Sequence, residues 1–153
     1  MGLEELKGAP EERETLFRLF VGDNSDRVIE IFRAQEKGEI GIFLNWAVIL
    51  FGSVWFFYRK MPFMGGLYFV IPILVFIIFP RNSVIFFLLY NPMVAGVADA
   101  LFVWKARRCI NRSEVMFSDQ EQREAWIERK GGYSMLGLLL GVGVEGGMLL
   151  LAT

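Results

Sequence analysis

The longest apolar stretch of the chain is residues 40–104, which read IGIFLNWAVILFGSVWFFYRKMPFMGGLYFVIPILVFIIFPRNSVIFFLLYNPMVAGVADALFVW. Charged side chains interrupt this stretch only at Arg59, Lys60, Arg81 and Asp99. About 20 apolar residues in a helix span the hydrocarbon core of a bilayer. Four apolar runs approach that length, at residues 40–58, 64–79, 84–104 and 134–152. The sequence therefore predicts an all-α, polytopic helical membrane protein with three or four membrane segments.

Polar segments lie before and between these runs, and they divide the chain into four parts. The predicted parts are an amphipathic helical tail at 1–39, membrane segments at 40–104, a cytoplasmic basic loop containing a helix at 105–133 and a last membrane helix at 134–153. The first run, at 40–58, either crosses the membrane, re-enters it or lies at its surface, because Asn45, Gly52 and Ser53 interrupt it.

Start and stop signals predict three short amphipathic helices in the polar parts. Pro10 is followed by acidic residues, which favours a helix start, and Gly22 ends that helix. A second helix is expected from Asp26 to Lys37. A third is expected to begin at the capping sequence 118–121 and to end at 131–132, where two glycines follow basic residues.

Composition excludes several classes of function. The chain of 153 residues has a net charge of −1 and no histidine, so it lacks both a basic field for nucleic acid and the commonest general base and metal ligand. Its one cysteine, Cys109, excludes an internal disulfide and a cysteine-based metal cluster. Because it lies beside Arg107 and Arg108, Cys109 is either a thiol of lowered pKa open to acylation or a small apolar side chain. We therefore expect no metal, no cofactor and no nucleic-acid partner.

Basic residues predict the topology. One cluster is Arg59 and Lys60, and the second begins at Lys105 and continues through the polar loop. Short loops rich in lysine and arginine stay in the cytoplasm, so the basic loops are expected there, in a multi-pass protein of a cell inner membrane. The side on which the amino terminus lies stays open, with a preference for the cytoplasm.

Part of this sequence resembles a bacterial membrane family. The matching residues are 20–26, which read VGDNSD after Phe20, then Phe32, 44–47 (LNWA) and 51–61 (FGSVWFFYRKM). They are similar to the core of the family called domain of unknown function 2628. The chain departs from that pattern at Val28, Leu44, Ser53 and Pro62. The resemblance implies a bacterial cell membrane and a cytoplasmic amino terminus, but it implies no reaction and no catalytic residue.

Two acids and one amide lie within apolar runs. Ionisable groups in such positions are costly and are therefore candidates for function. Asn91, Asp99 and Glu145 could form a path for protons or cations. In the alternative reading, Asp99 reaches the membrane surface and Glu145 is held in a helix–helix contact.

The last apolar run carries glycines at helical spacing. Gly137, Gly141 and Glu145 follow one another at intervals of four, and Gly143 and Gly147 form a second pair on roughly the opposite face. Small residues four apart let helices approach closely. These five residues are therefore predicted to form helix–helix interfaces, one of them with another subunit.

Aromatic and basic residues near the ends of the runs are predicted to be interfacial anchors: Trp46, Trp55, Tyr58, Arg59, Lys60 and Trp104. A ligand or lipid-headgroup site built from the same side chains is the alternative.

These observations favour a non-enzymatic accessory, scaffold or assembly subunit of a larger bacterial inner-membrane complex. The expected partners are membrane lipids and either a membrane-protein subunit or a second copy of the chain. The alternative is a small oligomeric transporter or channel that uses the intramembrane acids.

Overall fold

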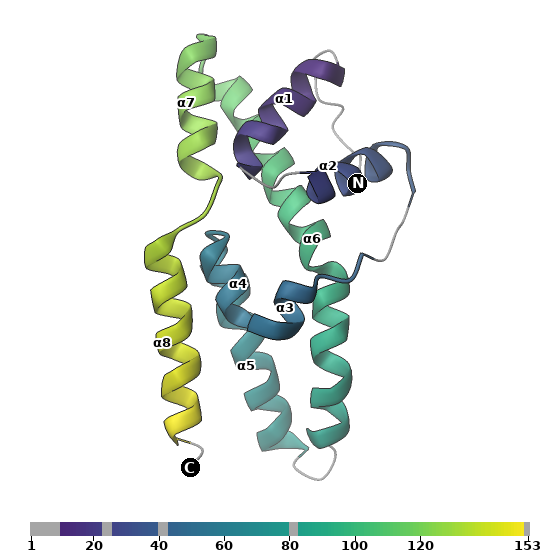
Figure 1. The fold of residues 1–153 in the computed structure, drawn as a ribbon, viewed down its shortest axis with the longest axis vertical. Helices are drawn as coiled ribbons and strands as arrows, with labels where there is room; N and C mark the ends of the chain where they lie inside the picture. The colour runs from purple at the N-terminus through teal and green to yellow at the C-terminus, as the bar shows by residue number, and fades with distance from the viewer. Residues whose placement is uncertain (1–9, 23–25, 40–42, 80–82, 152–153) are drawn as a thin grey trace. The chain divides into compact units, whose positions relative to one another are not determined.

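The computed structural model describes residues 10–22, 26–39, 43–79 and 83–151, and all regular elements in these ranges are α-helices (Figure 1). The helices are α1 (Pro10–Val21), α2 (Asp26–Glu36), α3 (Trp46–Phe51), α4 (Ser53–Tyr58), α5 (Pro62–Ile78), α6 (Ser83–Met116), α7 (Gln120–Lys130) and α8 (Met135–Leu151). Arg81 and the first residues of the predicted run at 40–58 lie outside the described residues.

The prediction of a polytopic membrane protein is wrong, and so is the inner-membrane, multi-pass location that followed from it. Within the described ranges, no helix has both the length and the apolar character that crossing a membrane requires. The run at 40–58 is split into two helices of 6 residues each. Both α5 and α8 have 17 residues. The long α6 holds Asp99 in its middle and basic side chains from Lys105 onward.

Local start and stop signals confirm the short helices. α1 begins at Pro10 and gives way to Gly22, whose φ is +76°, and α2 begins at Asp26. α7 is capped by Asp119, whose side chain accepts a hydrogen bond from the backbone N–H of Gln122 at 3.3 Å. The acidic cap satisfies one of the N–H groups that every helix start leaves unpaired.

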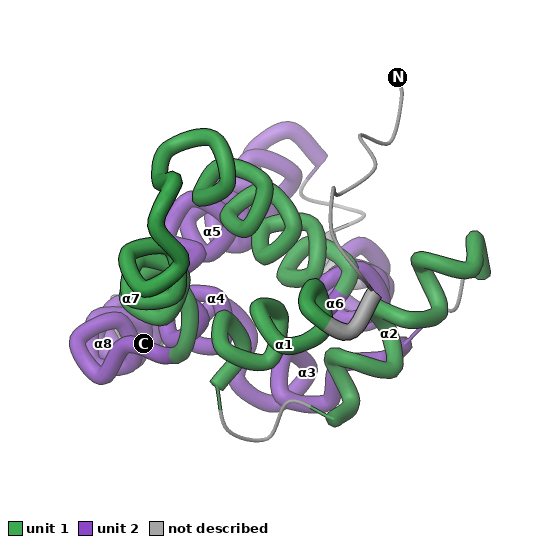
Figure 2. Tube along the Cα trace, turned by 90° about the horizontal axis from the view of Figure 1, so that it is seen from above, with its two compact units in different colours: residues 1–41, 100–132 green, residues 42–99, 133–153 purple. Residues whose placement is uncertain are grey.

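The chain divides into two compact units, one made of residues 1–41 and 100–132 and the other of residues 42–99 and 133–153 (Figure 2). We call them unit 1 and unit 2. Helix α6 belongs to unit 2 up to Asp99 and to unit 1 from Ala100 onward. The basic segment after Trp104 thus continues a helix, whereas the sequence predicted a loop there.

Unit 1 has an aromatic core. Phe17 of α1 stacks on Phe32 of α2 with ring centroids 4.4 Å apart, and Phe20 lies 5.7 Å from Phe102 of α6. At the end of α7, the N–H of Gly132 donates to the carbonyl of Phe20 at 2.6 Å. A Cβ on Gly131 would lie 2.0 Å from the same carbonyl oxygen, so α7 can meet α1 here only through a glycine.

Unit 2 is built around the short helix α4, which packs against both α5 and α8. α4 ends at Tyr58, and its C-cap Arg59 is followed by Lys60 in the left-handed region, at φ +55°. The N–H of Lys60 bonds to the carbonyl of Phe57, and the N–H of Met61 bonds to that of Phe56 at 2.7 Å. This hydrogen-bond pattern is a Schellman motif, which turns the chain from α4 into α5.

Candidate functional site

The candidate site lies in unit 2, where α8 crosses α4. A Cβ on Gly137 would lie 2.2 Å from the carbonyl oxygen of Phe57, and one on Gly141 would lie 2.9 Å from the Cα of Val54. Both glycines are buried. The N–H of Ser134 also donates to the carbonyl of Tyr58 at 2.8 Å, which ties the start of α8 to the end of α4. The Gly137 and Gly141 face thus packs within the chain itself.

The second glycine pair has no such neighbour. Among the described residues, a Cβ on Gly143, Gly146 or Gly147 would meet nothing within 4 Å. The face of α8 with Gly137 and Gly141 therefore packs against α4, whereas the face with Gly143 and Gly147 has no neighbouring helix among the described residues.

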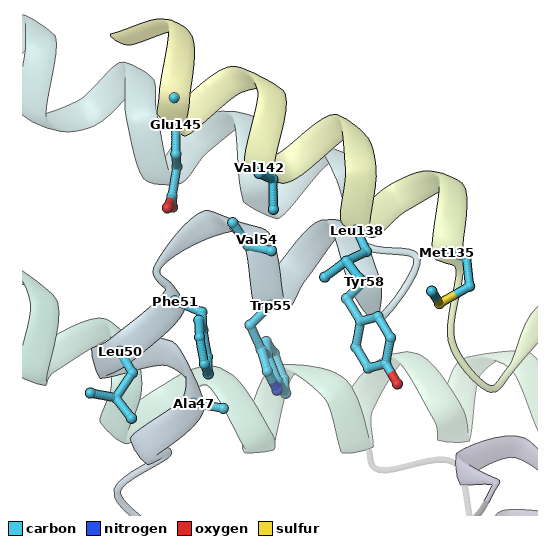
Figure 3. Close-up of a pocket in the computed structure, with 11 residues that line it drawn as sticks. Ala47, Leu50, Phe51, Val54, Trp55, Tyr58, Met135, Leu138, Val142 and Glu145 are labelled. Carbon is cyan, nitrogen blue, oxygen red and sulfur yellow. The ribbon is translucent and has the colours of Figure 1, made fainter. Parts of the chain in front are cut away.

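Glu145 reaches from α8 to the junction of α3 and α4 (Figure 3). Its Oε1 accepts two hydrogen bonds from Ser53, one from the backbone N–H and one from the hydroxyl, each at 3.0 Å. The carboxylate thus satisfies a donor at the first turn of α4, where negative charge is favoured. A Cβ on Gly52 would lie 2.8 Å from Oε1, and Gly52 has φ +51°, so both space and backbone require glycine there.

Asp99 has a different partner. Its Oδ1 accepts a hydrogen bond from the side-chain amide of Asn45 at 2.5 Å, and both residues are buried. Asn45 in turn caps α3 by accepting from the N–H of Val48, and its own N–H donates to the carbonyl of Ala95 at 3.0 Å. The pair thus holds the start of α3 against α6.

Asn91 joins three helices. Its Oδ1 accepts from the hydroxyl of Tyr68 at 3.0 Å, and its Nδ2 donates to the carbonyl of Ile49 at 3.2 Å. Asn91 and Asp99 thus both tie α6 to α3, whereas Glu145 ties α8 to the start of α4.

Sequence reasoning missed Tyr68, although it is a hydroxyl-bearing residue in an otherwise apolar helix, α5. Burial raises the pKa of Tyr68 to about 12, and the negative charge of Glu145 and the nearby Tyr90 add to that rise. Its ring also lies 3.2 Å from the position of a Gly52 Cβ. Tyr68 therefore lies between the Glu145 and Asn91 contacts.

A pocket of about 760 Å³ opens along α3, α4 and α8. The aromatic rings of Phe51, Trp55 and Tyr58 lie side by side along one wall, and α8 contributes Leu138 and Val142 (Figure 3). Glu145 is the one ionisable acid or base in the lining apart from the phenol of Tyr58. Pockets of this size with apolar walls and few polar groups are typical of small-molecule sites.

The six predicted anchors are scattered. Trp55 is 9% exposed whereas Trp46 is 61% exposed, so two of the predicted anchors lie in opposite environments. The guanidinium of Arg59 lies 6.0 Å from the ring of Tyr58, and burial lowers the pKa of Arg59. Lys60 belongs to the Schellman turn, and Trp104 belongs to unit 1, where Arg108 lies over its ring at 5.4 Å. A role as membrane anchors would need membrane-spanning helices beside them, and the described residues contain none.

Cys109 lies half-buried in α6 of unit 1. Burial raises its pKa, and the charges of Lys105 and Lys130 oppose that rise only in part, which favours a small apolar side chain over a thiol of lowered pKa. Among the described residues, no group of three or more histidine, cysteine, aspartate and glutamate side chains could hold a metal ion.

Comparison with known proteins gives no relative: no protein-family model, no curated protein and no solved structure matches this chain. The resemblance to the bacterial membrane family stays a prediction.

Proposed function

We propose that this protein is a non-enzymatic scaffold or accessory subunit that binds a helical segment of a partner protein through the outer face of α8. This face consists of Leu136, Leu140, Gly143 and Gly147, which fall within about 60° of one another at 100° per residue. It lies away from the Gly137 and Gly141 face, which contacts α4.

The exposure of this face carries the proposal. Leu136 is 68% exposed and Leu140 is 54% exposed, and no charged side chain shares the face. α5 adds further exposed apolar side chains in the same unit, including Phe76 and Ile77. Contiguous exposed apolar surface on a protein marks an interaction site, and an apolar helix face with fixed spacing suits a second amphipathic helix.

The polar groups support a binding role over catalysis. Glu145, Asp99 and Asn91 each use hydrogen bonds to position a helix within unit 2. A general acid or base must instead reach a proton on a substrate. The transport alternative needs membrane-spanning helices and is therefore not proposed.

The experiment is affinity purification of the tagged protein from its own cells, followed by mass spectrometry. We expect a stoichiometric partner with the native chain and a loss of about tenfold or more with Leu140→Lys, since a charge placed in an apolar contact costs at least about 1.4 kcal/mol. Leu140 is exposed, so the folded unit should tolerate the change, whereas Gly141→Leu would damage the packing of α8 on α4.

Val115→Lys is the matched control, because Val115 is an exposed apolar residue of α6 at 88% exposure and lies in unit 1. It should retain the partner. A native chain that purifies alone as a monomer, or equal recovery with Leu140→Lys, would refute the proposal. If the native chain purifies as a homodimer that Leu140→Lys disrupts, the partner bound by the outer face of α8 is a second copy of this chain.

A further inference from the structure

The pocket between α3, α4 and α8 has room for a ligand that the scaffold role does not use. Its volume of about 760 Å³ falls within the range of small-molecule sites. On α8, the pocket side chains Leu138, Val142 and Glu145 lie on a different side of the helix from Leu140 and Gly143. A ligand here would therefore leave the outer face of α8 free.

Glu145 brings a negative charge to the pocket that no basic side chain of the described residues pairs with. Glu145 uses Oε1 for both hydrogen bonds from Ser53, and Oε2 accepts none from the described part of the chain. Within those same residues, Glu145 forms no ion pair with lysine or arginine. An apolar wall weakens the screening of such a charge, so a cation brought beside it is attracted more strongly than in water.

The neighbouring side chains favour an organic cation over a hydrated ion. Phe51 and Trp55 lie along the wall beside Glu145, and aromatic faces attract ammonium groups (Figure 3). The rest of the lining is largely apolar and extends to Leu138 and Met135, where it can cover a hydrocarbon body. A metal ion would find a single carboxylate, which is too few ligands.

We propose that this pocket binds an organic cation with an apolar body, such as an alkylammonium, with the charged group at Glu145 and the hydrocarbon along α4 and α8. The proposal goes beyond the scaffold role and stands on different residues.

The test is isothermal titration of the purified full chain with three probes of equal length: decylammonium and decanoate below their micelle concentrations, and decanol below its solubility limit. We expect decylammonium to bind about tenfold more tightly than decanol, and decanoate to bind most weakly. Equal affinity for the three probes would overturn the proposal, because it would show apolar adsorption without recognition of charge. Absence of saturable binding would overturn it as well.

Glu145→Gln tests the charge itself. The amide keeps an oxygen that can accept from Ser53, so the α3–α4 junction is preserved. We expect decylammonium affinity to fall about tenfold to that of decanol, with decanol unchanged. Unchanged decylammonium affinity would overturn the proposal.

Two glycines of α8 test the location. A Cβ at Gly146 or at Gly143 would meet nothing within 4 Å, but only Gly146 lines the pocket. Gly146→Leu should fill the pocket and weaken both decylammonium and decanol at least fivefold, whereas Gly143→Leu should change neither. Equal effects of the two variants would place the probes elsewhere and overturn the proposal.

Discussion

Unit 1 and unit 2 bury their large apolar side chains to different extents, since most of those that are exposed belong to unit 2. In unit 1, Phe17, Phe20 and Phe32 have no more than 1% of their surface exposed. In unit 2, Leu50 and Phe63 of α3 and α5 are 71% and 72% exposed. The comparison shows that apolar composition alone does not indicate where a core lies.

Charge patterning explains why unit 1 can bury its apolar side chains. Its short helices α1 and α2 have one apolar face each, and charged residues on the other face pair across the helices. Glu14 accepts hydrogen bonds from Arg33 and Arg18, which lower the pKa of Glu14. α5 has apolar residues on all sides, so its contacts with α4 and, through Tyr68, with α6 still leave side chains such as Phe76 and Ile77 exposed.

The largest change in stability is expected from a substitution in the buried core of unit 1. Phe17→Ala should lower the free energy of unfolding by about 3–5 kcal/mol, because it removes a fully buried ring that stacks on Phe32. Phe76→Ala in unit 2 is the control, since Phe76 is 56% exposed, and it should change stability by less than about 0.5 kcal/mol. Urea denaturation followed by circular dichroism measures both, and similar losses would remove the contrast between the units.

A smaller effect separates the two faces of α8 within unit 2. Gly137→Ala should destabilise by about 1–3 kcal/mol, because its Cβ would press on the backbone of Phe57. Gly143→Ala should stabilise by about 0.5–1 kcal/mol, since it meets open space and removes a flexible helix residue. Thermal unfolding of the two variants under one condition gives the comparison; the same sign of change for both would contradict the assignment of faces.

The smallest effect concerns the buried phenol of unit 2. The folded-state pKa of Tyr68 is about 12 against an ordinary 10.0, so the neutral phenol is favoured by folding. Its contribution is fully present below pH 10 and is lost as the pH rises towards 12. Tyr68→Phe should therefore show a shallower loss of stability across that window than the native chain.

Ultraviolet titration of the phenolate sharpens this prediction. Glu145→Gln removes the charge that adds to the shift, so the pKa of Tyr68 should fall slightly yet stay above its ordinary value, because burial is the larger cause. A pKa that returns fully to 10.0 would show that the charge dominates.

Local chemistry predicted the ends of the short polar helices but not how the helices assemble. Pro10, Gly22 and Asp119 act on neighbouring backbone groups, so the sequence predicted α1 and α7 well. The break at Gly52 was visible as a glycine, but the sequence did not show that Glu145 and Tyr68 fill the space where its Cβ would lie. The predicted loop after Trp104 failed because lysine and arginine are good helix formers, and charge alone does not end a helix.

Local patterns were enough to predict the all-helical class, the ends of the short polar helices and the spacing of glycines and acids on α8, since these depend on residues a few positions apart. The folded chain was needed to show that α6 contributes to both units and that Glu145 accepts hydrogen bonds from Ser53 at the start of α4. It was also needed to show that one glycine face of α8 is closed while the other is open. The physical reason is that these features depend on residues far apart in the chain, whose meeting no local pattern encodes. The membrane prediction failed for a related reason, since hydropathy along the chain does not record where the backbone turns.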